Sequence, residues 1–253
     1  MFNSYKEIFT KRGASYHEAM TRWPDARRQE FLNVIQHIQL DQVERIADIP
    51  SGGGYCGRYV PQHVELFTVD ESPAFIAETT VRDNTHAICA PIHQTGIDTS
   101  SIDGVWSIAG LHHVDDKIPF FKEVHRILKP GGTFTVADAA QGSTTAEFLD
   151  SFVSSRNSSG HTGRYLTPEN LEELAATGFE IESSQNSNYP WVFDTPLDMA
   201  EFCRLLFGLD LVSDLEQLQQ DMRDTLKVEV AQNSTHLQWS LFTIVARKPL
   251  ETK

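Results

Sequence analysis

Five short apolar runs recur between residues 45 and 138, and helical or glycine-rich segments separate them. The runs are RIADI (45–49), VELFTV (64–69), HAICA (86–90), GVWSIA (104–109) and TFTVAD (133–138). Strands that alternate with helices indicate βαβ units, in which each crossover brings the next strand back parallel to the last. We therefore expect an α/β fold, with any ligand bound beyond the carboxyl ends of the strands.

Composition narrows the possible partners. The 35 acidic residues outnumber the 21 Lys and Arg residues, which gives a formal net charge of −14. A negative protein repels phosphate backbones and anionic lipids, so we expect no nucleic-acid or membrane partner. No run approaches the ~20 apolar residues that span a bilayer, and the amino-terminal residues lack the continuous apolar core of a secretion signal. A cytoplasmic location is predicted.

The chain has three cysteines, Cys56, Cys89 and Cys203, and they are widely spaced. No CxxC pair suggests a zinc site or a redox dithiol. We expect three buried thiols in a reducing compartment and predict no metal site.

A glycine loop follows the first strand-like run. Asp48 ends that run, Gly52, Gly53 and Gly54 follow, and the next run is succeeded by Asp70. Glycines allow a tight turn and a close approach of ligand to backbone N–H groups, and a carboxylate at the second strand end can accept from ribose hydroxyls. The pattern favours a nucleoside ligand. An ordinary tight turn and a solvated acid at Asp70 are the alternatives.

The downstream segments carry a resemblance. SSIDGVWSIAGLHHVDD (100–116), followed by FFKEVHRILKPGGTFTVADA (120–139), resembles the class I S-adenosylmethionine-dependent methyltransferases of the quinone-biosynthesis and small-molecule type. The resemblance covers residues ~45 to 140. It implies a Rossmann-like, seven-stranded, mostly parallel sheet with helices on both faces, S-adenosylmethionine as cofactor and methyl transfer to a small-molecule acceptor.

Carried over by position, the family pattern assigns Asp48 and the loop Ser51–Gly54 to the methionine end of the cofactor and Asp70 to its ribose. Two positions depart from the pattern. Pro50 replaces the first glycine of the loop, and Pro91 stands where relatives often have an acid that accepts from the adenine amino group. The predicted cofactor-binding residues are Asp48, Pro50, Ser51, Gly52, Gly53, Gly54, Asp70, Glu71, Pro91, Ile92 and Ala109.

Two adjacent histidines are the predicted catalytic residues. His112 and His113 follow the strand at 104–109, near the expected position of the sulfonium, where an imidazole can take a proton from an acceptor. They could instead only fill the strand end. His161 and Tyr165 could face the acceptor from a lid. Five aromatic residues could line an apolar acceptor pocket or simply hold the extra helices to the sheet: Tyr16, Trp23, Tyr189, Trp191 and Phe193.

No linker or repeat divides the chain, so we predict one methyltransferase domain over residues 1–253. Its parts are an amino-terminal helical cap (1–42), a cofactor-binding core (43–140), and a lid, helical insert and final strands (141–253). In the cap, Pro24 is expected to open a helix whose apolar residues between 31 and 38 share one face.

The third part is expected to begin with a helix and a mobile connection at 141–162, because that segment is rich in Ser, Thr and Gly. A strand at 179–184, helices near 196–207 and 213–230, and a final strand at 238–248 should follow.

Two other functions share the glycine loop. An NAD(P)-dependent oxidoreductase would use the literal G-x-G-x-x-G spacing of Gly52, Gly54 and Gly57, although no Y-x-x-x-K pair accompanies it. A catalytically degenerate binding protein with the methyltransferase fold would keep the loop without turnover. The sequence identifies neither the acceptor nor the oligomeric state.

Overall fold

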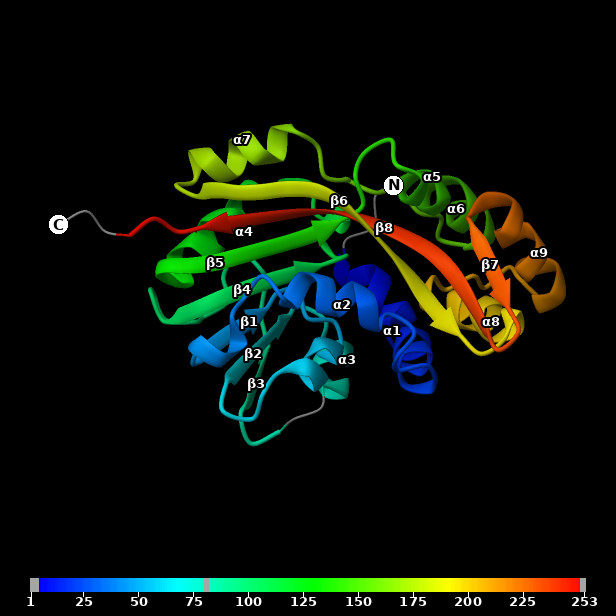
Figure 1. Ribbon diagram of the computed structural model, residues 1–253, viewed down its shortest axis with the longest axis horizontal. Helices are drawn as coiled ribbons and strands as arrows, with labels where there is room; N and C mark the ends of the chain where they lie inside the picture. Colours follow the sequence, from blue (N-terminus) through cyan, green and yellow to red (C-terminus); the bar gives the residue numbers. More distant parts are fainter. Residues whose placement is uncertain (1–4, 80–81, 251–253) are drawn as a thin grey trace.

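The computed structural model describes residues 5–79 and 82–250 (Figure 1). The central sheet has eight strands, with β7 paired only to β8 and the others in the order β3-β2-β1-β4-β5-β8-β6. The strands are β1 (Arg45–Asp48), β2 (Glu65–Asp70), β3 (Thr85–Cys89), β4 (Ile102–Ile108), β5 (Leu128–Asp138), β6 (Glu180–Phe193), β7 (Val228–Ala231) and β8 (Ser234–Arg247). The predicted α/β fold is confirmed, with one short strand more than expected.

Strands β1 to β5 form the parallel half of the sheet. The central strands are buried on both faces, as the burial of β4 and of Gly132–Asp138 in β5 shows, and this is the usual state of parallel strands covered by helices. The edge strand β3 is mostly exposed. The strand order reverses between β1 and β4, because β2 and β3 lie on one side and β5 on the other. A crevice for a ligand forms at such a point, beyond the strand carboxyl ends.

The other half of the sheet is antiparallel. β8 pairs with β5 only from Phe242 to Arg247, and its earlier residues continue beside β6 and β7. We call this extension the arm; it comprises Ser187–Phe193 of β6, Ser234–Leu241 of β8, and β7. In Figure 1 the arm curves away from the parallel half and the later helices gather around it.

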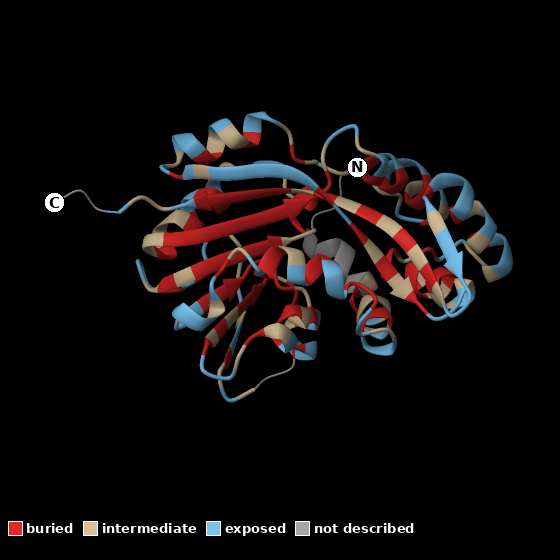
Figure 2. Ribbon diagram, in the orientation of Figure 1, coloured by how far each residue is buried: buried red, intermediate tan, exposed pale blue. Residues whose placement is uncertain are grey.

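Helices cover both faces. They are α1 (Tyr5–Arg22), α2 (Arg28–Ile35), α3 (Pro73–Glu78), α4 (Ile118–Ile127), α5 (Thr144–Glu147), α6 (Ser154–Arg156), α7 (Glu169–Ala176), α8 (Pro196–Leu206) and α9 (Leu215–Thr225). Alternate strand residues enter two cores: Ile46 and Trp106 join the core shared with α2 and the arm, whereas Ala47 and Val105 join the core under α4. Figure 2 shows this continuous burial and the exposed first half of β6 at the sheet edge.

Several sequence expectations about local structure need correction. Pro24 does not open a helix: it lies in the turn after α1, and α2 begins at Arg28. The helix expected at 213–230 ends at Thr225, and β7 takes its last residues into a hairpin with β8. Cys56 and Cys203 are buried as predicted, but Cys89 is exposed at the end of edge strand β3. Residues 1–4 of the predicted cap lie outside the described residues.

The segment 141–162 contains more packed structure than its composition suggested. After α5, residues Phe148–Val153 form a π-helical turn that leads into α6. Phe148, Leu149, Phe152 and Val153 are buried in the core shared with the arm. Only residues 157–164 are an irregular connection. Among the described residues, no helix is long and apolar enough to cross a membrane.

Candidate active site: two adjoining cavities

A cavity of about 490 Å³ opens beyond the carboxyl ends of β1 and β4, and we call it the donor cavity. Five of the predicted cofactor-binding residues line it: Asp48, Pro50, Ser51, Gly52 and Ala109. The cap closes the opposite side with Tyr16 and Arg27. The sequence analysis gave Tyr16 only as a candidate for the acceptor pocket and did not assign Arg27 to the cofactor, because nothing in the local pattern shows that α1 folds back over the glycine loop.

The glycine loop is tight and uses glycine for its backbone shape. Gly52 and Gly54 have φ of 53° and 68°, in the left-handed region that favours glycine. Two backbone bonds close the loop, from Ser51 N to Val69 O (2.9 Å) and from Gly54 N to Ser51 O (2.9 Å). A Cβ on Gly52 would meet no atom within 4 Å. A 3₁₀ turn, Tyr55–Tyr59, follows in place of the expected helix.

Asp48 is the polar group of the donor cavity that most needs a ligand. Its side chain is buried, and its Oδ2 has no hydrogen-bond partner among the described residues. Burial raises the pKa of Asp48 well above its ordinary value, and the nearby Asp70 carboxylate adds to the effect. A buried acid without a partner favours a cationic or hydrogen-bond-donating ligand. The α-ammonium group of a methionine moiety fits this requirement.

Asp70 lies beneath the loop rather than on the cavity wall. It is fully buried, and its carboxylate accepts the N–H of Gly52 (2.9 Å) and the N–H of Ser72 (2.8 Å). These bonds hold the glycine loop against β2 and the start of α3. The structure thus gives Asp70 a role in shaping the loop, whereas its predicted contact with a ribose is untested.

The other predicted cofactor-binding residues do not line the donor cavity. Glu71 follows β2, and Pro91 and Ile92 follow β3, next to the bond from Ala90 N to Asp70 O. Pro91 is exposed, while Ile92 packs against the core under α4. Gly53 and Gly54 shape the loop from outside the cavity.

A second cavity of about 520 Å³ adjoins the first, and we call it the acceptor cavity. Tyr16, Arg27 and Ala109 line both cavities. Ala109 has φ of 51°, an uncommon backbone for a residue other than glycine, so the junction is held in an unfavoured conformation. The apolar wall comes from the arm and the later helices: Leu149, Trp191, Leu206, Phe207 and Trp239.

Two of the five aromatic residues proposed for an acceptor pocket line this cavity. Tyr16 and Trp191 line the acceptor cavity, but Trp23, Tyr189 and Phe193 are not on its wall. Trp23 instead donates to Asp198 on α8 (3.2 Å) and packs on Phe202. Such residues hold the cap and helices in place, which was the alternative reading.

Arg27 is part of a buried ion pair. It donates to both carboxylate oxygens of Glu30 and to the Tyr16 hydroxyl (2.7 Å), and Trp191 Nε1 donates to Glu30 Oε2 (2.7 Å). Burial lowers the pKa of the Arg27 guanidinium, but the interactions with Glu30 and Tyr16 are stronger than this effect, so the pKa is raised above its ordinary value. The cap, the arm and both cavities therefore meet at one neutralised cluster.

His112 is held in the acceptor cavity by a carboxylate. It lies in the 3₁₀ turn Leu111–His113 after β4, and its Nδ1 is 2.8 Å from Asp138 Oδ1 at the end of β5. Asp138 also accepts the N–H groups of His112 (3.0 Å) and Ala139 (2.7 Å). Burial alone would raise the pKa of Asp138, but His112 and these N–H groups lower it below its ordinary value. The arrangement fixes the imidazole and leaves Nε2 as its reactive nitrogen.

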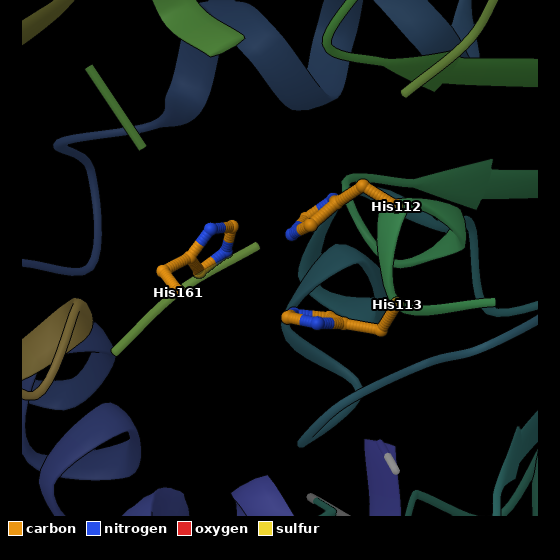
Figure 3. Close-up of side chains that lie close together, drawn as sticks. All are labelled: His112, His113 and His161. Atoms are coloured by element: carbon orange, nitrogen blue, oxygen red, sulfur yellow. The ribbon is translucent and has the colours of Figure 1, made fainter. Parts of the chain in front are cut away.

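His161 reaches the same cavity from the connection after α6. Its Nδ1 is 3.0 Å from Asp150 Oδ1 in the π-helical turn, and Asp150 also accepts from Tyr165 (2.6 Å). Burial and His112 lower the pKa of His161 to about 4. Burial, with His112 and His161, also holds the pKa of His113 well below its ordinary value. Figure 3 shows the three imidazoles facing one another.

Several known methyltransferases are similar to this chain. Residues 47–136 match the family model of a methyltransferase domain. A malonyl-[acyl-carrier protein] O-methyltransferase from Marinomonas sp. is 24% identical over 76% of this chain and 74% of its own. A solved Bacillus halodurans protein has a TM-score of 0.63 at 16% identity, covering 87% of this chain and 99% of its own. A Haemonchus contortus phosphoethanolamine N-methyltransferase, solved with S-adenosylhomocysteine, has a TM-score of 0.62 at 16% identity, covering 98% of this chain and 60% of its own.

The sheet order, the glycine loop and the matched domain together define the class of Rossmann-like methyltransferases. The matched domain and the similarity to named methyltransferases show an enzyme that transfers a methyl group from S-adenosylmethionine.

Proposed function

We propose that the chain methylates a hydroxyl group of a small, largely apolar acceptor bound in the acceptor cavity. The observation that carries this proposal is the junction of the two cavities at Tyr16, Arg27 and Ala109. A donor beside Asp48 and an acceptor beside His112 would meet there. S-adenosylmethionine, when bound, supplies a methyl group already activated by a sulfonium, so the protein has mainly to align the two reactants.

The walls favour an apolar acceptor with a polar end. Trp191, Trp239 and Phe207 offer flat apolar surfaces, and the three histidines stand at the other side of the cavity. Small-molecule sites commonly combine apolar walls with a few polar anchors. A ring or an alkyl group would pack on the tryptophans while its hydroxyl points toward His112.

His112 is the proposed proton acceptor. Its Nδ1–H is held by Asp138, so Nε2 is directed to take the acceptor proton. The Asp138 carboxylate then stabilises the imidazolium that forms, while its N–H bonds keep it ionised. His113 packs against the His112 ring, with centroids 4.1 Å apart, and limits its rotation. Asp138 thus acts as a positioning residue.

The donor side is assigned to the glycine loop. Asp48 and the loop residues Ser51 and Gly52 would hold the methionine end of the cofactor, and Tyr16 would cover it from the cap. No observation favours the oxidoreductase or the binding-only protein over methyl transfer.

Turnover on a panel of acceptors tests the proposal. Purified protein is incubated with radiolabelled S-adenosylmethionine and small phenols, hydroxy acids and fatty alcohols, and S-adenosylhomocysteine is measured. We expect label transfer to at least one hydroxyl compound, and loss of transfer in His112→Ala. The matched control is His93→Ala, because His93 is exposed and lines neither cavity. Cofactor binding without transfer to any compound would favour the binding-only protein.

A further inference from the structure

The three histidines of the acceptor cavity have the arrangement of a metal-binding set. Each offers a ring nitrogen, and these nitrogens all lie within 4.8 Å of one another. The side chains of His112 and His161 are 9% and 5% exposed, and His113 as a whole residue is 8% exposed. Figure 3 shows that they converge from two segments of the chain.

Two of the imidazoles have a carboxylate behind them. Nδ1 of His112 binds Asp138 (2.8 Å) and Nδ1 of His161 binds Asp150 (3.0 Å). Histidines that ligate metals usually donate their other ring N–H to a carboxylate or carbonyl, which fixes the ring and makes it a better ligand. Nε2 of both residues is then directed toward the centre of the cluster. Asp138 and Asp150 therefore play the same part, each holding the Nδ1 of one histidine.

The charges around the cluster suit a divalent cation. Asp138 and Asp150 place two carboxylates behind the imidazoles, and Arg27 is neutralised by Glu30. Arg12 also lines the cavity, and its positive charge opposes the binding of a cation.

We propose that His112, His113 and His161 bind a divalent transition-metal ion such as Zn²⁺, with an open position toward the acceptor cavity. Three imidazoles and one open position are typical of catalytic zinc sites. Ligand nitrogens around tetrahedral zinc lie about 3.3 Å apart, given Zn–N distances of ~2.0–2.1 Å. The irregular connection that carries His161 can supply the small closing movement.

The bound ion would orient an acceptor hydroxyl and lower its pKa. In that form His112 serves as a ligand, and water takes the proton. The sequence predicted no metal site because His161 lies 48 residues beyond His113 and no short motif joins them. The metal site rests on the side-chain cluster and stands independently of the proposed function.

Direct metal titration tests the site. Untagged protein is treated with EDTA, desalted and titrated with Zn²⁺ by calorimetry, and Co²⁺ is added separately to record its visible absorption. We expect one ion per chain and a Co²⁺ spectrum of imidazole ligation. His161→Ala should weaken Zn²⁺ binding at least about 100-fold, and Asp150→Asn about 10- to 100-fold. His93→Ala is the control and should bind like the parent.

Parent protein that takes up no Zn²⁺, or a His161→Ala variant that binds as tightly as the parent, would overturn the site. Circular dichroism and the thermal shift with S-adenosylhomocysteine show whether each variant is folded. If His161→Ala fails to fold, His161→Gln and the Co²⁺ spectrum of the parent give the answer. Failure of methyl transfer with intact Zn²⁺ binding would refute only the proposed function.

Discussion

The parallel half of the sheet and the arm are both built from β-strands, but the two regions differ in how many of their faces are covered. In β8, residues 234–242 alternate between buried and partly exposed, whereas residues 243–246 are buried without interruption. The change occurs where β8 leaves the two-faced cover of helices and enters the arm, which has one covered face. The single strand β8 thus shows the alternating burial of a sheet with one covered face and the continuous burial of a sheet that is covered on both faces.

The two regions also divide the site. The parallel half holds the donor cavity, built by the glycine loop and the ends of β1 and β4, while the arm and later helices build most of the acceptor cavity. Changes in the arm can therefore alter the acceptor cavity without altering the donor cavity. Each prediction below separates the two halves or tests the groups that join them.

The largest expected effect is on the buried cluster that joins them. Glu30→Ala leaves Arg27 buried without its carboxylate and removes the acceptor of Trp191 Nε1. Breaking a buried pair costs about 3–5 kcal/mol, so the free energy of unfolding in urea should fall by that amount. The exposed pair of Glu18 and Arg22 supplies the control. Glu18→Ala should cost less than about 1 kcal/mol, and equal losses in the two variants would refute the joining role.

The next effect separates chemistry from donor binding. His112→Ala should lower the methyl-transfer rate at least about 100-fold, because general-base catalysis contributes about 10²–10⁴-fold. Its affinity for S-adenosylmethionine should stay within about twofold of the parent, since His112 lines only the acceptor cavity. Rates with an acceptor from the panel, and calorimetry for the cofactor, measure the two quantities. A parallel fall of both would show that the cavities are not separable.

A smaller effect belongs to the parallel half alone. Asp70→Ala removes the acceptor of the Gly52 and Ser72 N–H groups, so the glycine loop should loosen and any ribose contact should be lost. We expect cofactor affinity to fall about tenfold or more, which corresponds to about 1.4 kcal/mol. Glu71→Ala, next in the chain, should change affinity little. Calorimetry on the two folded variants measures their affinity for S-adenosylmethionine. If both variants bind as tightly as the parent, the placement of the cofactor is wrong.

The smallest effect concerns the connection that carries His161. Residues 157–164 have no regular structure, whereas 148–153 are packed in the core. Amide exchange in 157–164 should slow when both ligands bind, with little change in 148–153, because only the connection has order to gain. Equal protection with and without ligands would remove the lid hypothesis.

The sequence predicted the parallel half better than the arm, for a physical reason. Short-range signals define the glycine loop and the ends of β1, β2 and β4, so the positions of Asp48 and Gly52 at the strand end could be predicted, whereas Asp70 lies beneath the loop and not on the cavity wall. The arm depends on pairings between residues that are 42 to 54 apart in the chain, such as Tyr189 with Trp239, which no local pattern shows.

The acceptor cavity shows the same limit at single residues. His112 and His113 were found because they follow a strand end, but their partners Asp138 and His161 come from other segments. Arg27 looks like a solvated helix residue in sequence, and only the fold of α1 and α2 over the loop buries it.

The central claim is that the donor cavity binds S-adenosylmethionine, and thermal unfolding tests it most directly. A ligand that binds only the native state increases the free energy of unfolding, by about 2.7 kcal/mol when its concentration is 100 times its Kd, and therefore raises the unfolding temperature. S-adenosylmethionine and S-adenosylhomocysteine should each raise the temperature of the parent, and NAD and NADP should leave it unchanged. Stabilisation by NAD or NADP, with none by S-adenosylmethionine or S-adenosylhomocysteine, would contradict the account.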